Sequence, residues 1–173
     1  MMSSVKMPVI EKLPAIKWAG RFIELASLVA SWSKDPSSKV GAVIADGKRI
    51  VSVGFNGFPE NVSDDLEIIA DRERKYRRVL HSEANAILFA KRDLSGCTLY
   101  CTHFPCCQCM SLALQAGIRI FVIPTQTKEY MDRWHESIKE SFLMAGEVNA
   151  HIYQYYTDRN AIVLFSYTSP DIF

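Results

Sequence analysis

The sequence predicts a single α/β domain over residues 1–173, with a mixed β-sheet covered by helices on both faces. Two observations carry this prediction. The chain has 173 residues, of which 49% are hydrophobic, enough for the core of one compact domain. A hairpin signal near residue 46 is followed by helical patterns that alternate with single strands, and this alternation is typical of layered α/β folds.

The first half of the chain predicts a helix and then a β-hairpin. Apolar residues recur with helical spacing from Phe22 to Val29, and Pro36 prevents the helix from continuing. Two β-rich runs at residues 40–46 and 49–55 are joined at Asp46 and Gly47, which form a favourable hairpin turn. The next residues, 56–65, have loop chemistry. The charged run at residues 71–78 lacks an apolar stripe, so we expect a solvated segment there.

The second half predicts three helices that alternate with three strands. Gly117 suits the end of the second of these helices, and Pro124 ends the strand that follows it. The predicted helices cover residues 82–92, 108–117 and 132–146, and the predicted strands cover residues 97–102, 118–124 and 148–156.

Charge and composition exclude several classes of protein. Twenty basic and nineteen acidic residues leave a formal charge of +1, so we expect no long nucleic acid as a partner. We find neither a secretory signal nor a run of apolar residues long enough to span a membrane, which predicts a soluble, cytoplasmic protein. All five cysteines lie between Cys97 and Cys109, a pattern that favours metal binding or catalysis over disulfides.

Two short motifs predict one metal site. His81 precedes Glu83 at the start of one predicted helix, and Cys106 precedes Cys109 at the start of the next. Cysteines three positions apart share a helix face, whereas Cys107 points about 100° away from Cys106. Two thiolates and a neutral imidazole balance the charge of Zn²⁺, and the helix N-termini favour the deprotonated sulfurs. Three protein ligands leave the fourth position for water, as in catalytic zinc sites.

Glu83 lies beside the predicted ligands and can take a proton from that water and pass it to a leaving group. The remaining cysteines are expected to be packed thiols. His103, His135 and His151 have no ligand partner at helical or hairpin spacing, so we do not expect them to bind the metal. His103 is the rival to His81, because it lies just before Pro105.

The HxE motif followed by PCxxC resembles the zinc-dependent cytidine and deoxycytidylate deaminases. The similarity to the deoxycytidylate deaminases within this family extends from Trp18 to about Tyr155. It includes "WSKDPSSKVGAVI", "GFNGFPENVSDD", "HSEANAI" and "HFPCCQCMSLALQAGI". The resemblance implies a three-layer α/β/α cytidine-deaminase-like fold with five strands over a core of about residues 18–155. Residues 156–173 are then a C-terminal extension.

The resemblance also implies an activity and a substrate site. The expected reaction is hydrolytic deamination of dCMP to dUMP and ammonia in the synthesis of pyrimidine deoxynucleotides, with Glu83 as the proton shuttle. Asn56 matches a sugar-contacting asparagine of the family. Cations and hydroxyls near the first strand are candidates for the 5′-phosphate. The implied substrate residues are Ser33, Lys34, Lys39, Ala42, Asn56, Ser82 and Tyr130.

Members of this family are commonly hexamers that respond to dCTP and dTTP. The resemblance therefore implies a homo-oligomer, a nucleotide effector and Mg²⁺ bound with that effector. The candidate residues for the effector are Phe55, Asn56, Gly57, Asp64, Asp65, Arg74 and Arg77.

Two alternatives remain open from the residues alone. The first is deamination of another substrate, such as cytidine, dCTP or adenosine in RNA, although the low charge does not favour RNA. The second is a non-catalytic, zinc-stabilised nucleotide-binding module, which would have no use for Glu83.

The apolar run at residues 161–167 would be an aggregation-prone edge if bare, so we expect it to pack on the body or on another subunit.

Overall fold

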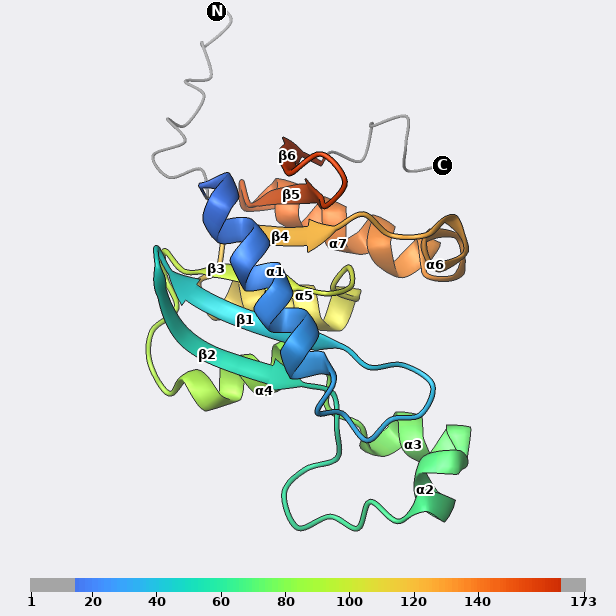
Figure 1. Ribbon diagram of the computed structural model, residues 1–173. Helices are drawn as coiled ribbons and strands as arrows, with labels where there is room; N and C mark the ends of the chain where they lie inside the picture. Colours follow the sequence, from blue (N-terminus) through green and yellow to red (C-terminus); the bar gives the residue numbers. More distant parts are fainter. Residues whose placement is uncertain (1–14, 166–173) are drawn as a thin grey trace, which may run out of the picture.

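The structure, a computed structural model that describes residues 15–165, confirms the layered α/β architecture (Figure 1). The helices are α1 Ile16–Ala30, α2 Leu66–Ala70, α3 Arg72–Arg78, α4 Ser82–Ala90, α5 Cys107–Gln115, α6 Lys128–Arg133 and α7 His135–Glu147. The strands are β1 Gly41–Asp46, β2 Arg49–Phe55, β3 Thr98–Cys101, β4 Ile120–Pro124, β5 His151–Tyr156 and β6 Ala161–Leu164. Within these residues no helix is both long enough and apolar enough to cross a membrane.

The sheet has six strands in the order β2-β1-β3-β4-β5-β6, one more than the sequence predicts. β1 pairs antiparallel with β2 and β3, whereas β3, β4 and β5 run parallel to one another. The additional strand is β6, which pairs antiparallel with β5. Its short apolar run covers what would otherwise be the open edge of β5.

The predicted packing of the C-terminal extension on the body is confirmed for residues 161–165. Phe165, directly after β6, is buried, and its ring contacts those of Phe104 and Phe142. The remainder of the extension, residues 166–173, lies outside the described residues.

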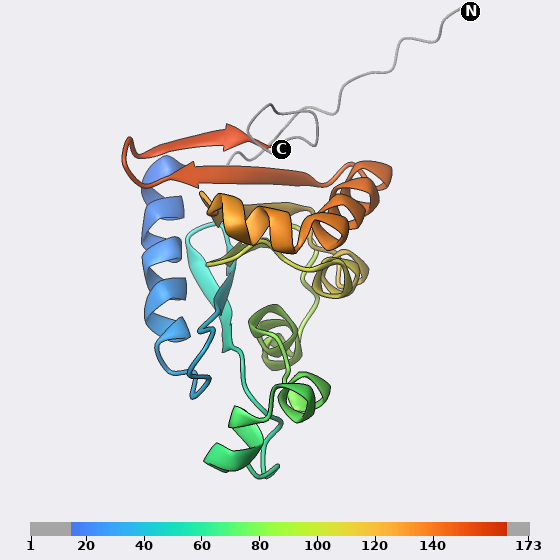
Figure 2. The same cartoon turned by 90° about the vertical axis from the view of Figure 1, so that its right-hand side faces the viewer.

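The sheet is the middle of three layers, with α1 on one face and α4, α5 and α7 on the other (Figure 2). On the α1 side, Phe22 and Ala26 pack in one core with Val43, Tyr100 and Val122 of the sheet. The larger core on the opposite side joins apolar residues of β1, β3 and β4 to those of the other three helices. It includes Ile44, Leu99, Phe121, Ala86, Met110 and Phe142. Burial on both faces explains why the central strands are almost continuously apolar.

Two glycines allow the helices to approach the hairpin closely. A Cβ atom at Gly54 in β2 would lie 2.3 Å from the carbonyl oxygen of Ser82 and 2.4 Å from the nitrogen of Ala86. A Cβ at Gly41 in β1 would lie 2.0 Å from the carbonyl oxygen of Ala26. Gly54 therefore sets how closely the first turn of α4 lies against the sheet.

The charged run at residues 71–78 is largely exposed, as the sequence predicts, but most of it forms the helix α3 and one of its residues, Lys75, is buried. Asp71 caps this helix, accepting hydrogen bonds from the backbone nitrogens of Glu73 and Arg74. Lys75 is buried and its Nζ lies 3.1 Å from Asp35 Oδ1. This ion pair fixes α3 against the loop after α1. Because the contact is between two charged side chains, α3 needs no apolar stripe that the sequence could reveal.

The single helix predicted over residues 132–146 is in fact two helices, α6 and α7, separated by Trp134. The backbone of Trp134 has φ −105° and ψ 14°, outside the helical range. Gly146 does not end α7, which continues to Glu147. The break at Trp134 lies beside the cavity that contains His81 and Glu83.

Candidate active site

The starts of α4 and α5 bring His81, Cys106 and Cys109 together, as the sequence predicts. His81 and Cys106 are the residues that precede the two helices, each with extended backbone angles. His81 Nδ1 lies 3.5 Å from Cys106 Sγ and 3.4 Å from Cys109 Sγ. The three ligand atoms all lie within 4.8 Å of one another.

The arrangement fits a tetrahedral zinc ion. With Zn–S bonds of about 2.3 Å and a Zn–N bond of about 2.0 Å, sulfur and nitrogen ligands at the tetrahedral angle lie about 3.5 Å apart. The two sulfur–nitrogen separations, 3.5 Å and 3.4 Å, match this value. The donor set of one imidazole and two thiols is also typical of zinc and leaves one coordination position open.

The electrostatics of the sulfurs favour a cation. The hydrogen bond from Cys109, with His81 close by, lowers the pKa of the Cys106 thiol. The same partnership with Cys106, together with burial and the charge of Glu83, raises the pKa of Cys109. The first of the two thiols therefore loses its proton easily, whereas the second keeps its proton because two adjacent thiolates would repel each other. A divalent cation bound between the sulfurs would offset this repulsion.

Glu83 lies in the first turn of α4, beside the cluster, and is buried with only 4% of its surface exposed. Ser82 Oγ donates a hydrogen bond to Glu83 Oε2 at 3.0 Å. Burial raises the pKa of the Glu83 carboxyl above its ordinary value. A raised pKa makes this carboxylate a stronger base than an ordinary one, which suits a group that must accept a proton and later release it.

Cys107 and His103 lie outside the ligand cluster. The backbone nitrogen of Cys107 donates to Ser137 Oγ at 2.9 Å, and Cys107 does not belong to the group of ligand atoms. His103 instead lines the wall of the cavity, where its ring lies 5.2 Å from that of Tyr130. Burial lowers the pKa of His103. Because His103 is not among the clustered ligand atoms but lines the cavity, its position suits contact with a substrate rather than with the metal.

A cavity of about 200 Å³ opens onto the metal cluster and Glu83. Aromatic side chains supply much of its wall, as expected for a site that holds a planar ring. The lining includes Asn56, Tyr76, His103, Phe104, Tyr130 and Trp134.

Three of the predicted substrate residues line this cavity. Ser82 lies beside Glu83, and the hydroxyl of Tyr130 donates to the carbonyl oxygen of Phe104. Asn56 is buried at the end of β2, where its amide accepts from the backbone nitrogen of Val40 and donates to the carbonyl of Ser38.

The other four predicted substrate residues do not line the cavity. Ser33 is buried and donates to the carbonyl oxygen of Asn56, while Ala42 is buried within β1. Lys34 forms an exposed ion pair with Asp64, and Lys39 donates to the carbonyl oxygen of Ser31.

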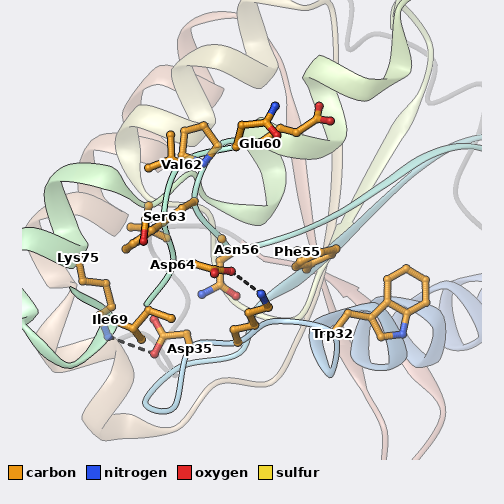
Figure 3. A pocket seen from close by; sticks show the side chains of 16 residues that line it. Trp32, Asp35, Phe55, Asn56, Glu60, Val62, Ser63, Asp64, Ile69 and Lys75 are labelled. Carbon is orange, nitrogen blue, oxygen red and sulfur yellow. Dashed lines mark hydrogen bonds and ion pairs between the residues drawn. The ribbon is translucent and has the colours of Figure 1, made fainter. Parts of the chain in front are cut away.

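A second cavity, of about 510 Å³, lies between the loop after β2 and the loop after α1 (Figure 3). Of the predicted effector residues, Phe55, Asn56, Gly57 and Asp64 line it, but Asp65, Arg74 and Arg77 do not. Asp65 accepts a hydrogen bond from Ser63, and Arg77 pairs with Glu73 on the surface of α3.

Several site residues were not identified from the sequence. Asp35 and Val79 line both cavities, and Lys75 lines the larger one. Arg133 and Trp134 line the smaller cavity. The sequence interpretation placed Arg133 and Trp134 inside one uninterrupted helix, and only the break after α6 brings them to the cavity wall.

The fold and the site together define a three-layer α/β/α protein with a zinc centre at the starts of two helices. Comparison with known proteins supports the zinc site. The family model of the cytidine and deoxycytidylate deaminase zinc-binding region matches residues 16–125. The chain belongs to this family of zinc-dependent cytidine and deoxycytidylate deaminases.

Individual relatives support this assignment. An uncharacterized deaminase from the luxG 3′ region of Aliivibrio fischeri is 52% identical over 136 residues, which are 79% of this chain and 92% of the relative. Deoxycytidylate deaminase of Mus musculus is 39% identical over 129 residues, 70% of this chain and 69% of the mouse protein. A solved structure of dCMP deaminase from cyanophage S-TIM5, in complex with dCMP and dUMP, has a TM-score of 0.64 at 24% identity. It covers 83% of this chain and 98% of the phage protein, and this similarity establishes the fold.

Proposed function

We propose that the chain catalyses the hydrolytic deamination of dCMP to dUMP and ammonia. The observation that carries the proposal is the buried Glu83 carboxyl beside the His81, Cys106 and Cys109 cluster, at the base of a cavity with aromatic walls. Among similar proteins, those of mouse and human are deoxycytidylate deaminases.

In this mechanism the metal ligands are His81, Cys106 and Cys109. Zn²⁺, when bound, supplies a Lewis acid that makes water a nucleophile at neutral pH. Glu83 accepts a proton from the attacking water and delivers protons to N3 and then to the departing amine. Oxygen adds to C4, the bond from C4 to the amino nitrogen breaks, and ammonia leaves. The Ser82 hydroxyl orients the Glu83 carboxyl.

The cavity wall would orient the nucleotide. Phe104, His103 and Tyr130 offer flat surfaces on which the cytosine ring can lie. The side-chain amide of Asn56 has two N–H donors, of which one is used by the Ser38 carbonyl. The second N–H donor supports the proposal that Asn56 contacts the sugar, as the family resemblance implies.

We also propose that the larger cavity holds a nucleotide effector, dCTP or dTTP, together with Mg²⁺. Trp32 and Phe55 supply flat apolar walls, and Asp64 supplies a carboxylate near Lys34. The roles expected for Ala42, Asp65, Arg74 and Arg77, a hexameric assembly, the division near residue 155 and a cytoplasmic location stay predictions.

One assay tests the activity and its regulation together. The zinc-loaded protein is given cytidine, deoxycytidine, dCMP and dCTP as separate substrates, with and without added dCTP or dTTP. We expect dCMP to have the highest kcat/KM and the effectors to change its rate in opposite directions. A higher kcat/KM for deoxycytidine than for dCMP would contradict the proposed substrate. Identical rates with and without effectors would contradict the effector site.

A further inference from the structure

We propose that Arg133, at the end of α6, binds the 5′-phosphate of the substrate and so makes the site selective for nucleotides over nucleosides. This inference rests on the proposed function, since it names the residue that would distinguish dCMP from deoxycytidine. It differs from the expectation drawn from the sequence, which places the phosphate at Ser33, Lys34 and Lys39.

The cavity is too small to enclose the whole nucleotide, so the phosphate must lie at its rim. A volume of about 200 Å³ is below the roughly 300–1,000 Å³ of most small-molecule sites. A cytosine ring with C4 facing the metal cluster would fill the inner part, and the sugar and phosphate would extend outward. The phosphate group therefore needs a cation at the mouth rather than at the base of the cavity.

Arg133 is the only lysine or arginine that lines the cavity of the metal site, considering residues 15–165. The cavity also has two carboxyl groups, those of Glu83 and Asp35. Glu83 is at the metal end, and Asp35 is paired with Lys75 at 3.1 Å, which offsets its charge. Arg133 is thus the cation in the wall that is free to meet an anion.

The Arg133 guanidinium has no ion pair or hydrogen bond among the residues that the structure describes. Its side chain is exposed, so binding a phosphate requires no existing contact to break. A guanidinium offers two parallel N–H donors to phosphate oxygens, and such charge-assisted pairs are stronger than neutral hydrogen bonds.

The break between α6 and α7 holds Arg133 at the cavity. Trp134 interrupts the helix, and its ring lies 6.5 Å from that of Tyr130 on the same wall. Tyr130 is in turn fixed by its hydrogen bond to the carbonyl of Phe104 and by its contact with His103. The backbone nitrogen of Trp134 also donates to the carbonyl oxygen of Tyr130 at 3.1 Å, so Arg133 lies in the turn that joins these two residues of the cavity wall.

The lysines of the competing assignment are engaged elsewhere. Lys34 lines the larger cavity, where its Nζ lies 2.5 Å from Asp64 Oδ2. Lys39 is exposed and donates to the carbonyl of Ser31. Neither lysine lines the cavity that contains Glu83.

The test compares nucleotide with nucleoside in both binding and turnover. The zinc-loaded wild type is compared with Arg133→Gln, Arg133→Lys, Lys34→Gln and Lys39→Gln. Arg49→Gln is the matched control, because Arg49 is exposed and lines neither cavity. Calorimetry gives the Kd of dUMP and of deoxyuridine, and their ratio is the preference for the phosphate. Steady-state kinetics give KM and kcat for dCMP and deoxycytidine.

For Arg133→Gln we expect the phosphate preference to fall about ten- to a hundredfold, the change produced by losing a hydrogen bond to a charged group. KM for dCMP should rise by a similar factor, with deoxycytidine kinetics unchanged. Arg133→Lys should restore part of the preference, and Arg49→Gln should equal the wild type.

An unchanged phosphate preference in Arg133→Gln, or a loss confined to the Lys34→Gln or Lys39→Gln variants, would overturn the inference. A wild type that binds dUMP but deaminates no cytosine nucleotide would contradict the proposed function alone, since the binding ratio would still decide the role of Arg133. A wild type with no preference for dUMP over deoxyuridine would overturn the inference directly.

Discussion

At the scale of single residues, the chemistry depends on a carboxyl group that is removed from water but close to a cation site. Glu83 is 4% exposed, and its neighbours within reach are the Ser82 hydroxyl and the metal ligands. A glutamine at this position keeps the shape and the hydrogen bond but cannot carry a proton. This substitution therefore distinguishes proton transfer by Glu83 from binding of the metal.

We expect Glu83→Gln to keep one zinc per chain and to lose kcat for dCMP by about 10²- to 10⁴-fold, the usual contribution of general acid and base catalysis. Metal analysis and steady-state kinetics measure the two effects. Glu140→Gln, an exposed change on α7, is the control and should leave both unchanged. Deamination by Glu83→Gln at near the wild-type rate would exclude the proton shuttle.

Substitution of each cysteine tests which sulfurs bind the metal. Cys106→Ser and Cys109→Ser should each lower the zinc content sharply, because each removes one of three ligand atoms. Cys107→Ser should keep full zinc, since only its backbone nitrogen has a role at this point, donating to Ser137. Metal content per chain is the measurement. Loss of zinc from Cys107→Ser alone would reverse the choice of ligands.

At the scale of elements, the position of α4 depends on the absence of a side chain in β2. A Cβ at Gly54 would meet the backbone of Ser82 and Ala86, so the start of the helix would have to move away from the sheet. We expect Gly54→Ala to destabilise the fold by about 1–3 kcal/mol, measured by urea unfolding, and to weaken zinc binding as well. Gly146→Ala in α7 is the control, because a Cβ there meets nothing within 4 Å. Equal stability of the two variants would contradict the close approach.

The buried pair of Asp35 and Lys75 connects α3 to the loop after α1. Burial alone would raise the pKa of Asp35, but hydrogen bonds from the Ser37 backbone and from Lys75 outweigh it and lower the pKa below its ordinary value. The charged carboxylate therefore stabilises the fold above the unfolded-state pKa of about 3.9. This contribution is lost as the pH falls through the lower, folded-state pKa.

Asp35→Asn should accordingly destabilise the protein at pH 7 by about 3 kcal/mol, since it leaves Lys75 buried without a partner. The difference from the wild type should shrink as the pH is lowered below about 4. Urea unfolding at a series of pH values measures this difference. Asp64→Asn, which removes the exposed pair with Lys34, should change stability little at any pH. A difference for Asp35→Asn that does not depend on pH would exclude the pair as its source.

At the scale of the whole molecule, the outer surface of the helical layer carries large apolar side chains. Leu88 and Phe89 on α4 are 63% and 64% exposed, and Leu112 on α5 is 50% exposed. Apolar residues of this size on adjacent helices are typical of surfaces between subunits. We therefore expect the predicted homo-oligomer to assemble on this part of the surface.

We expect Phe89→Glu to lower the mass of the protein in sedimentation equilibrium, with zinc content retained in the dissociated form. Leu66→Glu on α2 is the control: Leu66 is 83% exposed but belongs to a different part of the surface. A wild type that sediments as a monomer, or a Phe89→Glu variant of unchanged oligomeric mass, would place any assembly surface elsewhere.

Local patterns in the sequence determined the layered fold, five of the six strands, and the metal cluster with Glu83. The turn at Asp46, the alternation of apolar runs and the i, i+3 spacing of Cys106 and Cys109 are local patterns. The pairing of His81 with these cysteines, 25 and 28 positions later, was predicted from the two motifs at the starts of consecutive helices. The tertiary structure decided which residues surround the cavity. Helix α3 is fixed by Lys75 pairing with Asp35, forty positions earlier. Arg133, next to the break at Trp134, lines the wall, whereas Lys34 lines the other cavity and pairs with Asp64. Contacts of this kind join residues that are distant along the chain, and no periodicity in the sequence records them.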